Sequence, residues 1–581
     1  MELPYYCDMK KRFLLTLTAA GFLAMGCTQV MAGDDAAVAQ PAPGFAGQFL
    51  SSHFAQSEND WAVAERFLTP VLSHDPENVD LLKRAMILAM GAGDLKQAAM
   101  HADKLLKLDA NNSLGWLIGA VNKLVDNDVS AAGDVLAKMP AGDVTDFVRP
   151  VVNGWIEAAQ GRFVTEGFNA TTIHSYGGAL IALHLGREQD AAEFIQRMLD
   201  TGSLNSYDAG RVADLYAAIG KDDKALDFYK GAYSLDSKNK TLEKKVALLS
   251  AGKKIPQRMN DALHIKTPAQ GVAVAMNDLA RILFQEYSDS SARIFSQMAL
   301  ILYPGYTDAQ LLLGNALARS ERYDEAIAYF SAISPEHDNY LEVQHYMADL
   351  LDEAGQTEKA MALLNDLFMK YNDVEALIRI GDIYRNKESY GSALKAYNRA
   401  AGKIGKEIPE EYWYLLYARG MVYEREGQWS DAERDLKAAL VFRPDHPYLL
   451  NYLGYAWADQ GVNLEESLRL LGRASSLRPD DGFIKDSLGW VYYMMGRYEE
   501  GLPYLEKAVE LMPYDPTLND HLGDAYWQVG RHMEAHFQWE RTFNYAGIND
   551  EELKKSAALK LEKGLLPQSS VKEARTGAHK Q

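Results

Sequence analysis

The stretch that decides the fold is DSLGWVYYMMGRYEEGLPYLEKAVELMP (Asp486–Pro513), because the following DHLGDAYWQVGRHMEAHFQW (Asp520–Trp539) repeats its pattern. A shift of 34 residues, from Asp486 to Asp520, aligns the two stretches. The repeated positions are small, aromatic or leucine, so the pattern indicates how elements pack and not a chemical site. A fixed period of this length indicates a repeat architecture. The aligned pairs are Leu488 and Leu522, Gly489 and Gly523, Tyr492 and Tyr526, Gly496 and Gly530, and Leu505 and Trp539.

The same spacing continues towards the N-terminus. Gly454, Gly420 and Gly381 each precede an apolar or aromatic residue, and Pro444, Pro479 and Pro513 close three units. Counting on a small residue in the second half of each unit gives about thirteen units, with one eroded unit between Val144 and Phe168. The phase breaks at Ala251–Gly271, a basic stretch with two prolines. No strand-type alternation of useful length is present, so we expect an all-α chain.

This set of apolar residue, glycine, tyrosine, alanine, bulky residue, alanine and proline resembles the tetratricopeptide repeat (TPR), over nearly the whole chain after residue 48. The resemblance implies a superhelical solenoid in which each unit is a pair of antiparallel helices. We expect an N-terminal lobe of degenerate repeats at 49–250, a linker at 251–271 and a C-terminal lobe at 272–548. A short helix and a disordered tail are expected at 549–581.

The N-terminus carries the pattern of an export signal. MKKRFLLTLTAAGFLAMGC (Met9–Cys27) has a basic start, an apolar run and small residues, which is typical of a secretory signal peptide. We take Met9 as the true start and 1–32 as the signal region. LAMGC resembles a bacterial lipobox that would lipidate Cys27, and cleavage after Ala32 is the alternative. Residues 33–48 are expected to be a flexible linker.

Composition narrows the function classes. The chain has 581 residues and a formal net charge of -20, which disfavours nucleic acid as a partner. Phosphate-binding loops, nucleophile elbows and His-Glu-x-x-His pairs are absent from the sequence, and the repeats leave no room for a catalytic domain. We therefore expect no enzyme activity and no cofactor. An alternative from another class is a zinc-dependent hydrolase using His532 and His536, which lie four residues apart on one helix.

A second signal lies in the first helices of the C-terminal lobe. In the TPR family these helices line a concave groove, and the positions that point into it carry aromatic rings and carboxylates here. We expect these side chains to face the groove and to bind an extended or helical peptide with apolar and basic residues. Packing between neighbouring repeats is the competing interpretation of each ring. The candidate groove residues are Tyr414, Tyr417, Tyr448, Asn451, Tyr455, Phe483, Asp486, Trp490, Tyr493, Asp520, Asp524 and Trp527.

The resemblance extends to large TPR lipoproteins of the proteobacterial envelope. It implies a non-catalytic scaffold or adaptor, exported to the periplasm and anchored in the outer membrane through Cys27, that holds protein or peptide partners. Adaptor for an envelope protease and factor in envelope assembly are the roles that it implies. The N-terminal lobe is assigned to spacing or self-association. A scaffold in the cytoplasm, with Met9–Cys27 as an ordinary apolar helix, remains the alternative.

Overall fold

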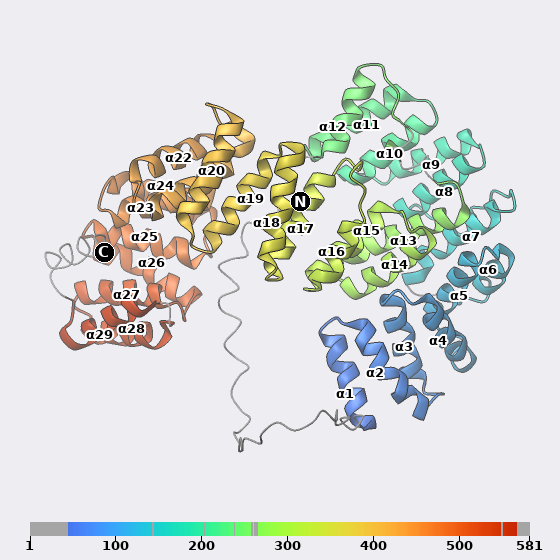
Figure 1. The fold of residues 1–581 in the computed structure, drawn as a ribbon, viewed down its shortest axis with the longest axis horizontal. Coiled ribbons are helices and arrows are strands. Elements are labelled where there is room, and N and C mark those ends of the chain that lie inside the picture. The colour runs from blue at the N-terminus through green and yellow to red at the C-terminus, as the bar shows by residue number, and fades with distance from the viewer. Residues whose placement is uncertain are drawn as a thin grey trace, which may run out of the picture.

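The chain folds as a curved array of helices, running from α1 at one end to α29 at the other (Figure 1). The computed structural model describes residues 44–141, 144–202, 204–237, 239–256, 259–260, 265–547 and 550–565. Over those ranges the secondary structure is helical, and no strand occurs. Within the same ranges no helix combines the length and apolarity that crossing a membrane requires.

The described residues of the N-terminal half form five helix pairs and two unpaired helices. Its helices are α1 (Phe45–Ser57), α2 (Trp61–His74), α3 (Val79–Gly91), α4 (Leu95–Leu108), α5 (Ser113–Val125), α6 (Val129–Leu136), α7 (Arg149–Ala158), α8 (Thr172–His184), α9 (Glu188–Asp200), α10 (Ser206–Ala218), α11 (Asp222–Leu235) and α12 (Lys240–Ser250). The unpaired helices are α7 and α12. The eroded unit that the sequence predicts contains α7 and a short 3-10 helix, η2 (Val144–Phe147).

Eight further pairs follow. They are α13 (Pro268–Gln285), α14 (Asp289–Leu302), α15 (Thr307–Arg319), α16 (Tyr323–Ser331), α17 (Tyr340–Glu353), α18 (Thr357–Tyr371), α19 (Val374–Asn386), α20 (Tyr390–Ile404), α21 (Trp413–Arg425), α22 (Trp429–Phe442), α23 (Pro447–Asp459), α24 (Leu464–Leu477), α25 (Gly482–Met494), α26 (Tyr498–Leu511), α27 (Pro516–Gln528) and α28 (His532–Tyr545). The last helix, α29 (Glu551–Lys563), is unpaired, and the 3-10 helix η5 (Glu410–Tyr412) precedes α21. The described ranges thus hold thirteen pairs, which confirms the predicted number of units.

Local sequence explains where the helices begin and turn. The first helix of many pairs starts after Asp or Asn, whose side chain accepts a hydrogen bond from a backbone N–H of the first turn, as Asp481 does from Ile484 at 3.1 Å. The tight turn to the second helix needs one residue with a positive φ, which glycine adopts without strain. Gly496 and Gly530 hold this position with φ of 73° and 81°.

The repeated glycine of the first helix lets the two helices of a pair approach closely. A Cβ added at Gly489 would lie 2.5 Å from the side chain of Leu505, and one at Gly523 would lie 2.6 Å from the ring of Trp539. Leu505 and Trp539 are fully buried. The positions that align in the sequence therefore form the contact within each pair, as the repeat pattern predicts.

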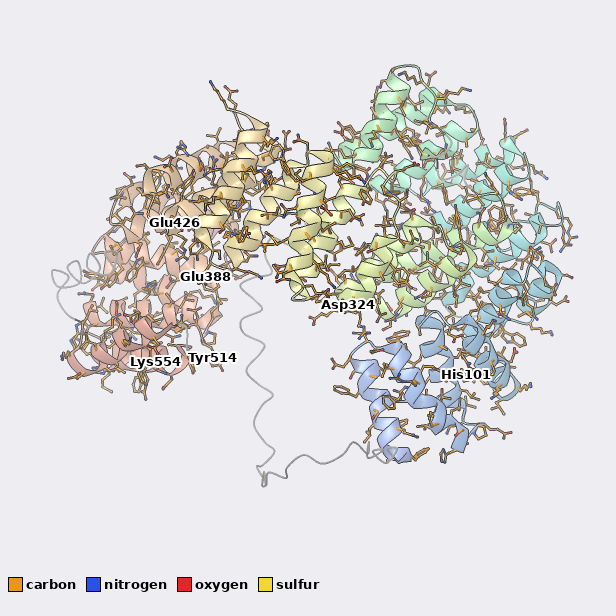
Figure 2. The ribbon with its side chains drawn as sticks, viewed as in Figure 1. His101, Asp324, Glu388, Glu426, Tyr514 and Lys554 are labelled. Atoms are coloured by element: carbon orange, nitrogen blue, oxygen red, sulfur yellow. The ribbon has the colours of Figure 1, made fainter. Side chains whose placement is uncertain are left out.

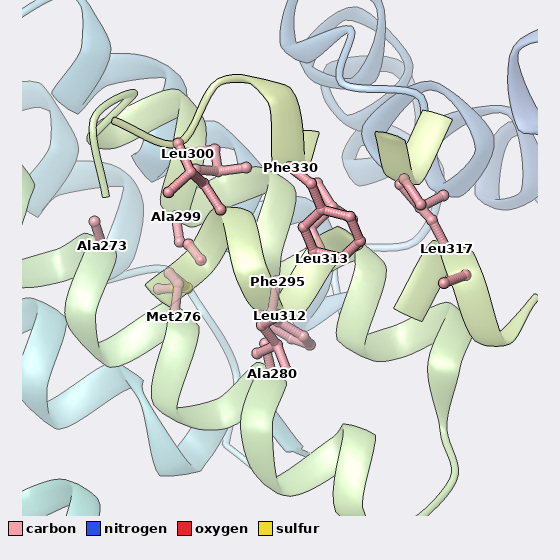
Figure 3. Close-up of a cluster of buried hydrophobic side chains, with 14 of the residues drawn as sticks. Ala273, Met276, Ala280, Phe295, Ala299, Leu300, Leu312, Leu313, Leu317 and Phe330 are labelled. Atoms are coloured by element: carbon pink, nitrogen blue, oxygen red, sulfur yellow. The ribbon is translucent and has the colours of Figure 1, made fainter. Parts of the chain in front are cut away.

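The helices α13 and α14 pack back against the N-terminal half. α13 contacts α7 and α8, and α14 contacts α3 and α5, so this pair covers first helices of much earlier units. Most positions around both helices are buried, including Gly271–Ala280 of α13 and Ala292–Leu300 of α14. Figure 3 shows this pair joined to α15 and α16 by side chains such as Met276, Phe295, Leu313 and Phe330.

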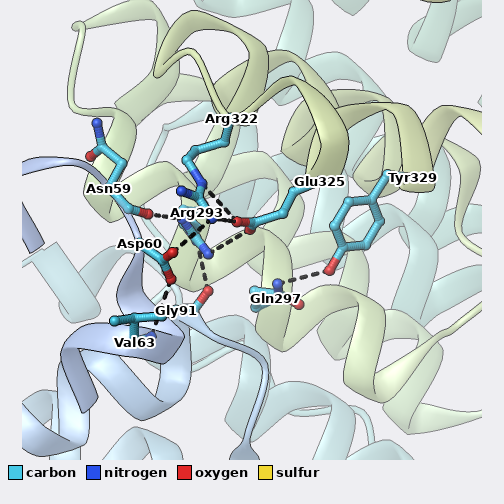
Figure 4. Close-up of polar contacts among 9 residues, drawn as sticks. All are labelled: Asn59, Asp60, Val63, Gly91, Arg293, Gln297, Arg322, Glu325 and Tyr329. Atoms are coloured by element: carbon cyan, nitrogen blue, oxygen red, sulfur yellow. Dashed lines mark hydrogen bonds and ion pairs between the residues drawn. The ribbon is translucent and has the colours of Figure 1, made fainter. Parts of the chain in front are cut away.

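A buried arginine fixes this contact. The guanidinium of Arg293 on α14 donates to the carbonyls of Gly91 at 2.7 Å and Asn59 at 3.1 Å, and it bonds the carboxylate of Glu325 at 3.0 Å (Figure 4). Beside it, Arg322 forms an ion pair of 3.2 Å with Asp60. The turn after α1 and the end of α3 are thus held against α14 and α16. The N-terminal half and the α13–α14 pair share one hydrophobic core, which extends as far as α22.

Two predicted boundaries differ from the observed helices, and a third agrees. α1 begins at Phe45, so the predicted linker at 33–48 is wrong for its last four residues. α13 begins at Pro268, inside the predicted linker at 251–271. α29 supplies the short helix expected after residue 549. The signal region with Met9, Cys27 and Ala32, residues 33–43 of the first predicted linker and the tail after residue 565 lie outside the described residues. The division into two lobes stays a prediction.

Candidate protein-binding face

The first helices of the C-terminal pairs form a continuous face, here called the first-helix face. It consists of α17, α19, α21, α23, α25 and α27, and neighbouring members such as α23 and α25, or α25 and α27, contact one another. One residue after the repeated glycine, or its alanine equivalent, lies on this face in each helix. These positions are Asp349, Asp382, Met421, Tyr455, Trp490 and Asp524.

At the C-terminal end of this face, the predicted groove residues lie between repeats. The side chains of Asp486, Trp490, Tyr493, Asp520 and Asp524 are all buried. The ring of Trp490 stacks on Tyr493 at 4.6 Å and on His521 at 4.0 Å, and Asp486 bonds the His521 ring at 2.8 Å. Our expectation that these five side chains face the solvent of the groove is therefore wrong. Packing between neighbouring repeats, the competing interpretation, describes them.

The C-terminal helix α29 covers the last two carboxylates. The ammonium of Lys560 lies 2.7 Å from Asp520 and 2.7 Å from Asp524, and the indole of Trp539 donates to Asp524 at 2.9 Å. Trp527 is half-buried beside Gly564, where an added Cβ would lie 2.3 Å from the ring. α29 thus occupies the position that the first helix of a further repeat would take.

Burial shapes the electrostatics of this cluster. Burial and the neighbouring carboxylate of Asp520 together raise the pKa of Asp524 to about 6, against the opposing effect of Lys560. Burial lowers the pKa of His521, but the carboxylates of Asp486 and Asp520 outweigh it and raise the pKa above its usual value. The cluster is an internal charge network, closed by α29.

The predicted residues of α21, α23 and the start of α25 are more accessible. Tyr414, Tyr417, Tyr448, Asn451, Tyr455 and Phe483 are all half-buried. The hydroxyl of Tyr414 donates to Glu375, and that of Tyr448 donates to Asp481 at 3.2 Å. Burial raises the pKa of Tyr417 to about 12, so its hydroxyl stays neutral. This part of the face presents rings and hydroxyls.

Sequence reasoning missed an acidic region further along the same face, on α17 and α19. The guanidinium of Arg379 pairs with Asp349 and lies 3.4 Å from Glu375, while Arg385 lies 3.3 Å from Asp382. The side chain of Asp349 is 40% exposed. The signal was present, because Asp382 follows Gly381 and Asp349 follows the alanine that takes the glycine position.

Carboxylates outweigh guanidinium groups in this region. Burial raises the pKa of Asp349, Glu353 adds a smaller effect in the same direction, and Arg379 does not compensate fully. Burial likewise raises the pKa of Asp382, against the opposing effects of Arg385 and the Tyr397 hydroxyl. A further positive charge would therefore stabilise both ionised carboxylates.

The proposed zinc ligands do not form a metal site with any third residue. His532 and His536 contact the ring of Trp527, with centroid distances of 4.2 and 6.1 Å. Over the ranges that the structure covers, no group of three His, Cys, Asp or Glu side chains could hold a metal ion. The zinc hydrolase alternative therefore has no support from the described residues.

Comparison with known families agrees with the helix pairs. Profiles of the tetratricopeptide repeat match residues 275–339, 374–402, 417–482 and 484–515. The chain is a tetratricopeptide repeat protein. TPR arrays support a role as a protein–protein interaction scaffold, and the fold is typical of proteins without catalysis.

Relatives of this TPR protein align over part of its length. It is 28% identical over 191 residues to a TPR repeat-containing protein of Pseudomonas aeruginosa, covering 32% of this chain and 31% of the relative. It is 27% identical over 173 residues to TPR repeat-containing protein YpiA of Bacillus subtilis, covering 29% of this chain and 39% of the relative. The chain thus spans about a third of the length of the curated relatives it matches.

Solved structures give weaker similarities. The Cut9–Hcn1 hetero-tetramer of APC/C shares 14% identity and a TM-score of 0.36, covering 83% of this chain and 96% of the other. A MamA fragment from Desulfovibrio magneticus shares 20% identity and a TM-score of 0.26, covering 32% of this chain and 96% of the other. The fold rests on the helix pairs described above and not on these similarities.

Proposed function

We propose that this TPR protein is a non-catalytic adaptor of the bacterial envelope that holds a basic and apolar segment of a partner protein against its first-helix face. The acidic region of α17 and α19 is the reason for proposing that the partner segment is basic. Asp349, Glu375 and Asp382 share the guanidinium groups of Arg379 and Arg385. A lysine or arginine of the partner would supply the charge that this region lacks.

The rings of α21 and α23 support the apolar part. Tyr417, Tyr455 and Phe483 are half-buried and so keep surface for contact. They follow the acidic region along the same face, which gives a partner segment carboxylates at one end and rings at the other. Aromatic side chains bring contact area with few rotatable bonds, which favours them in binding surfaces.

Two synthetic helical peptides test the partner chemistry. One is built of Leu, Ala and Lys, and the other has Glu in place of each Lys. We expect fluorescence polarisation to show that the full chain binds the basic peptide on the order of tenfold tighter, with binding that weakens as salt rises. Equal affinity for the two peptides, or no binding of either, would contradict the proposal.

A pair of variants locates the binding. Asp349→Asn with Asp382→Asn should weaken binding of the basic peptide on the order of five- to tenfold, because two carboxylates lose their charge. Asp431→Asn is the matched control, since Asp431 is 43% exposed on the second helix α22 and pairs with Arg434. If the control weakens binding as much as the double variant, the peptide is responding to net charge alone.

The envelope location is supported by the basic, apolar and small segments of Met9–Cys27. Growth with labelled palmitate tests it. Label that is lost on Cys27→Ser supports the lipid anchor, label-free periplasmic protein supports cleavage after Ala32, and unmodified protein in the cytoplasm contradicts export. A role as adaptor for an envelope protease or an assembly factor depends on which partner carries the basic segment.

A further inference from the structure

The two ends of the solenoid differ in the side chains that they expose. Terminal repeats normally cover the end of the core with a polar outer surface. α29 follows this rule, because seven of its thirteen residues carry charge. α1 does not, because its sequence FAGQFLSSHFAQS contains no Asp, Glu, Lys or Arg. Figure 2 shows both ends, with Lys554 marking α29 and His101 marking α4 near α1.

The uncharged residues of α1 divide into an inner and an outer side. On the inner side Ser52 donates to the Ala64 carbonyl at 2.8 Å, and Ala55 is buried. The opposite side is called here the outer α1 face. It carries Leu50 and Phe54, which are 65% and 67% exposed and lie one helical turn apart. The other members of the outer α1 face are Ala46, His53 and Ser57.

We propose that the outer α1 face rests on the lipid surface of the membrane to which the chain is anchored, which depends on the envelope location proposed above. A helix that lies in a membrane interface presents Leu and Phe side chains to the acyl chains. The absence of a carboxylate on this face matters, because the chain has a net charge of -20 and most of its surface repels anionic lipid. α1 is thus the described helix best suited to approach a bilayer.

The length of chain before α1 argues for lipid over other occupants. Residues 28–44 separate the predicted lipid-bearing Cys27 from Phe45. Even fully extended, these 17 residues reach about 60 Å, so an anchored chain keeps α1 close to the bilayer. Tethering raises the effective concentration of the surface, so a weak apolar contact is enough for docking.

The test uses a chain that begins at Thr28 and keeps every described residue. Cys7 and Cys27 are the two cysteines of the sequence, so this chain has none and can be labelled at one chosen site. An N-terminal histidine tag binds it to vesicles of phosphatidylethanolamine and phosphatidylglycerol that contain a nickel-chelating lipid. The tag replaces the predicted lipid, so failure of α1 to dock is distinguishable from failure of lipidation, which labelled palmitate tests separately.

A polarity-sensitive dye reports the contact. On Ala46→Cys, in the outer α1 face, we expect a blue shift of emission on tethering and quenching by brominated lipid. On Ala558→Cys, at an alanine of α29 that is also exposed, we expect neither. Adding Leu50→Ser and Phe54→Ser to Ala46→Cys should abolish the shift, while flotation shows that the protein stays tethered.

Two results would overturn the proposal. The first is a tethered protein whose Ala46→Cys dye keeps its emission in water. The second is a blue shift that appears without vesicles as protein concentration rises, because that result assigns the outer α1 face to a second copy of the chain.

Discussion

The first helices of the N-terminal half are covered by other helices of the chain, whereas those of the C-terminal half form an accessible surface. In the N-terminal half the first helices α3, α5 and α8, together with the unpaired α7, are covered by α13 and α14 of the same chain. In the C-terminal half the corresponding face, from α17 to α25, keeps half-exposed rings and carboxylates such as Asp349 and Tyr455. The same repeat thus builds a filled core in one half and an accessible surface in the other. This difference is the reason why we propose the C-terminal half as the partner-binding part.

The largest loss of stability is expected when a buried charge is removed from the N-terminal half, where α13 and α14 cover the first helices. Arg211 on α10 and Asp278 on α13 form an ion pair of 2.7 Å, with side chains 9% and 5% exposed. Asp278→Ala leaves a buried guanidinium unpaired and should destabilise the protein by about 3–5 kcal/mol. Urea unfolding, with hydrogen exchange of α10 and α13, measures the loss.

The matched control removes a more exposed carboxylate from the open face. Asp349 is 40% exposed, and Asp349→Ala leaves the buried Arg379 with Glu375 as a second carboxylate 3.4 Å away, so it should cost less, about 1 kcal/mol. Equal costs at Asp278 and Asp349 would mean that the two halves do not differ in burial as described.

Trp490 tests where the open face ends. Its side chain is 6% exposed and stacks between Tyr493 and His521, so Trp490→Ala should cost about 3 kcal/mol through a cavity. Tyr455→Ala, at the equivalent position of the preceding repeat, should cost less because Tyr455 is half-buried. Thermal melting compares the two variants. A small effect of Trp490→Ala on the melting temperature would indicate that Trp490 belongs to the binding surface and not to the core.

A smaller difference is expected when a methyl group is added between paired helices. In Gly178→Ala and in Gly381→Ala the new Cβ meets a ring at 2.4 Å, that of Phe194 or of Tyr397. Each change should cost about 1–3 kcal/mol, and the cost should be larger at Gly178. The reason is that every residue from Ile173 to Ala182 of α8 is buried, whereas α19 carries the partly exposed Glu375 and Asp382. Urea midpoints of the two variants give the order, and the reverse order would contradict it.

The smallest effect concerns pH at the C-terminal end. The pKa of Asp524 is raised to about 6, so the folded chain binds a proton that the unfolded chain has lost between about pH 4 and pH 6. Stability therefore falls as pH rises through this window. The raised pKa of His521 adds in the same direction, because protonated His521 is stabilised only in the folded chain.

Exchange of α29 amides should accordingly be slower at pH 4.5 than at pH 6.5 after correction for intrinsic rates. The free energy of opening should differ by about 1–2 kcal/mol. Asp524→Asn should remove most of the difference. A stability that rises with pH in the unchanged protein would show that Lys560 controls the cluster instead.

Sequence predicted the repeat because its signal is local. Gly489 and Leu505 belong to one unit, and their close contact recurs wherever the pattern recurs. Whether a helix face is buried or exposed depends on residues far away in the sequence. Lys560, which covers Asp520, lies 40 residues further along the chain, and Arg293 bonds the carbonyl of Gly91 over 202 residues. The repeat period of the sequence does not predict such contacts.

The candidate site illustrates the same limit. The predicted positions lie on the first-helix face, but the sequence could not say that Trp490 is stacked between helices and that Asp349 is open. One clue was available for the filled half. The run GVAVAM (Gly271–Met276) is apolar on all sides of α13, which indicates a helix enclosed by others.

The bonds of Arg293 also set the order of events during synthesis. A ribosome that adds about 5–20 residues per second needs about 10–40 s to proceed from Gly91 to Arg293. Throughout that interval α3 and α5 exist without the pair that covers them, so the first repeats of every new chain present apolar surface to their surroundings. The N-terminal half, although it is made first, completes its folding only after α14 has been made.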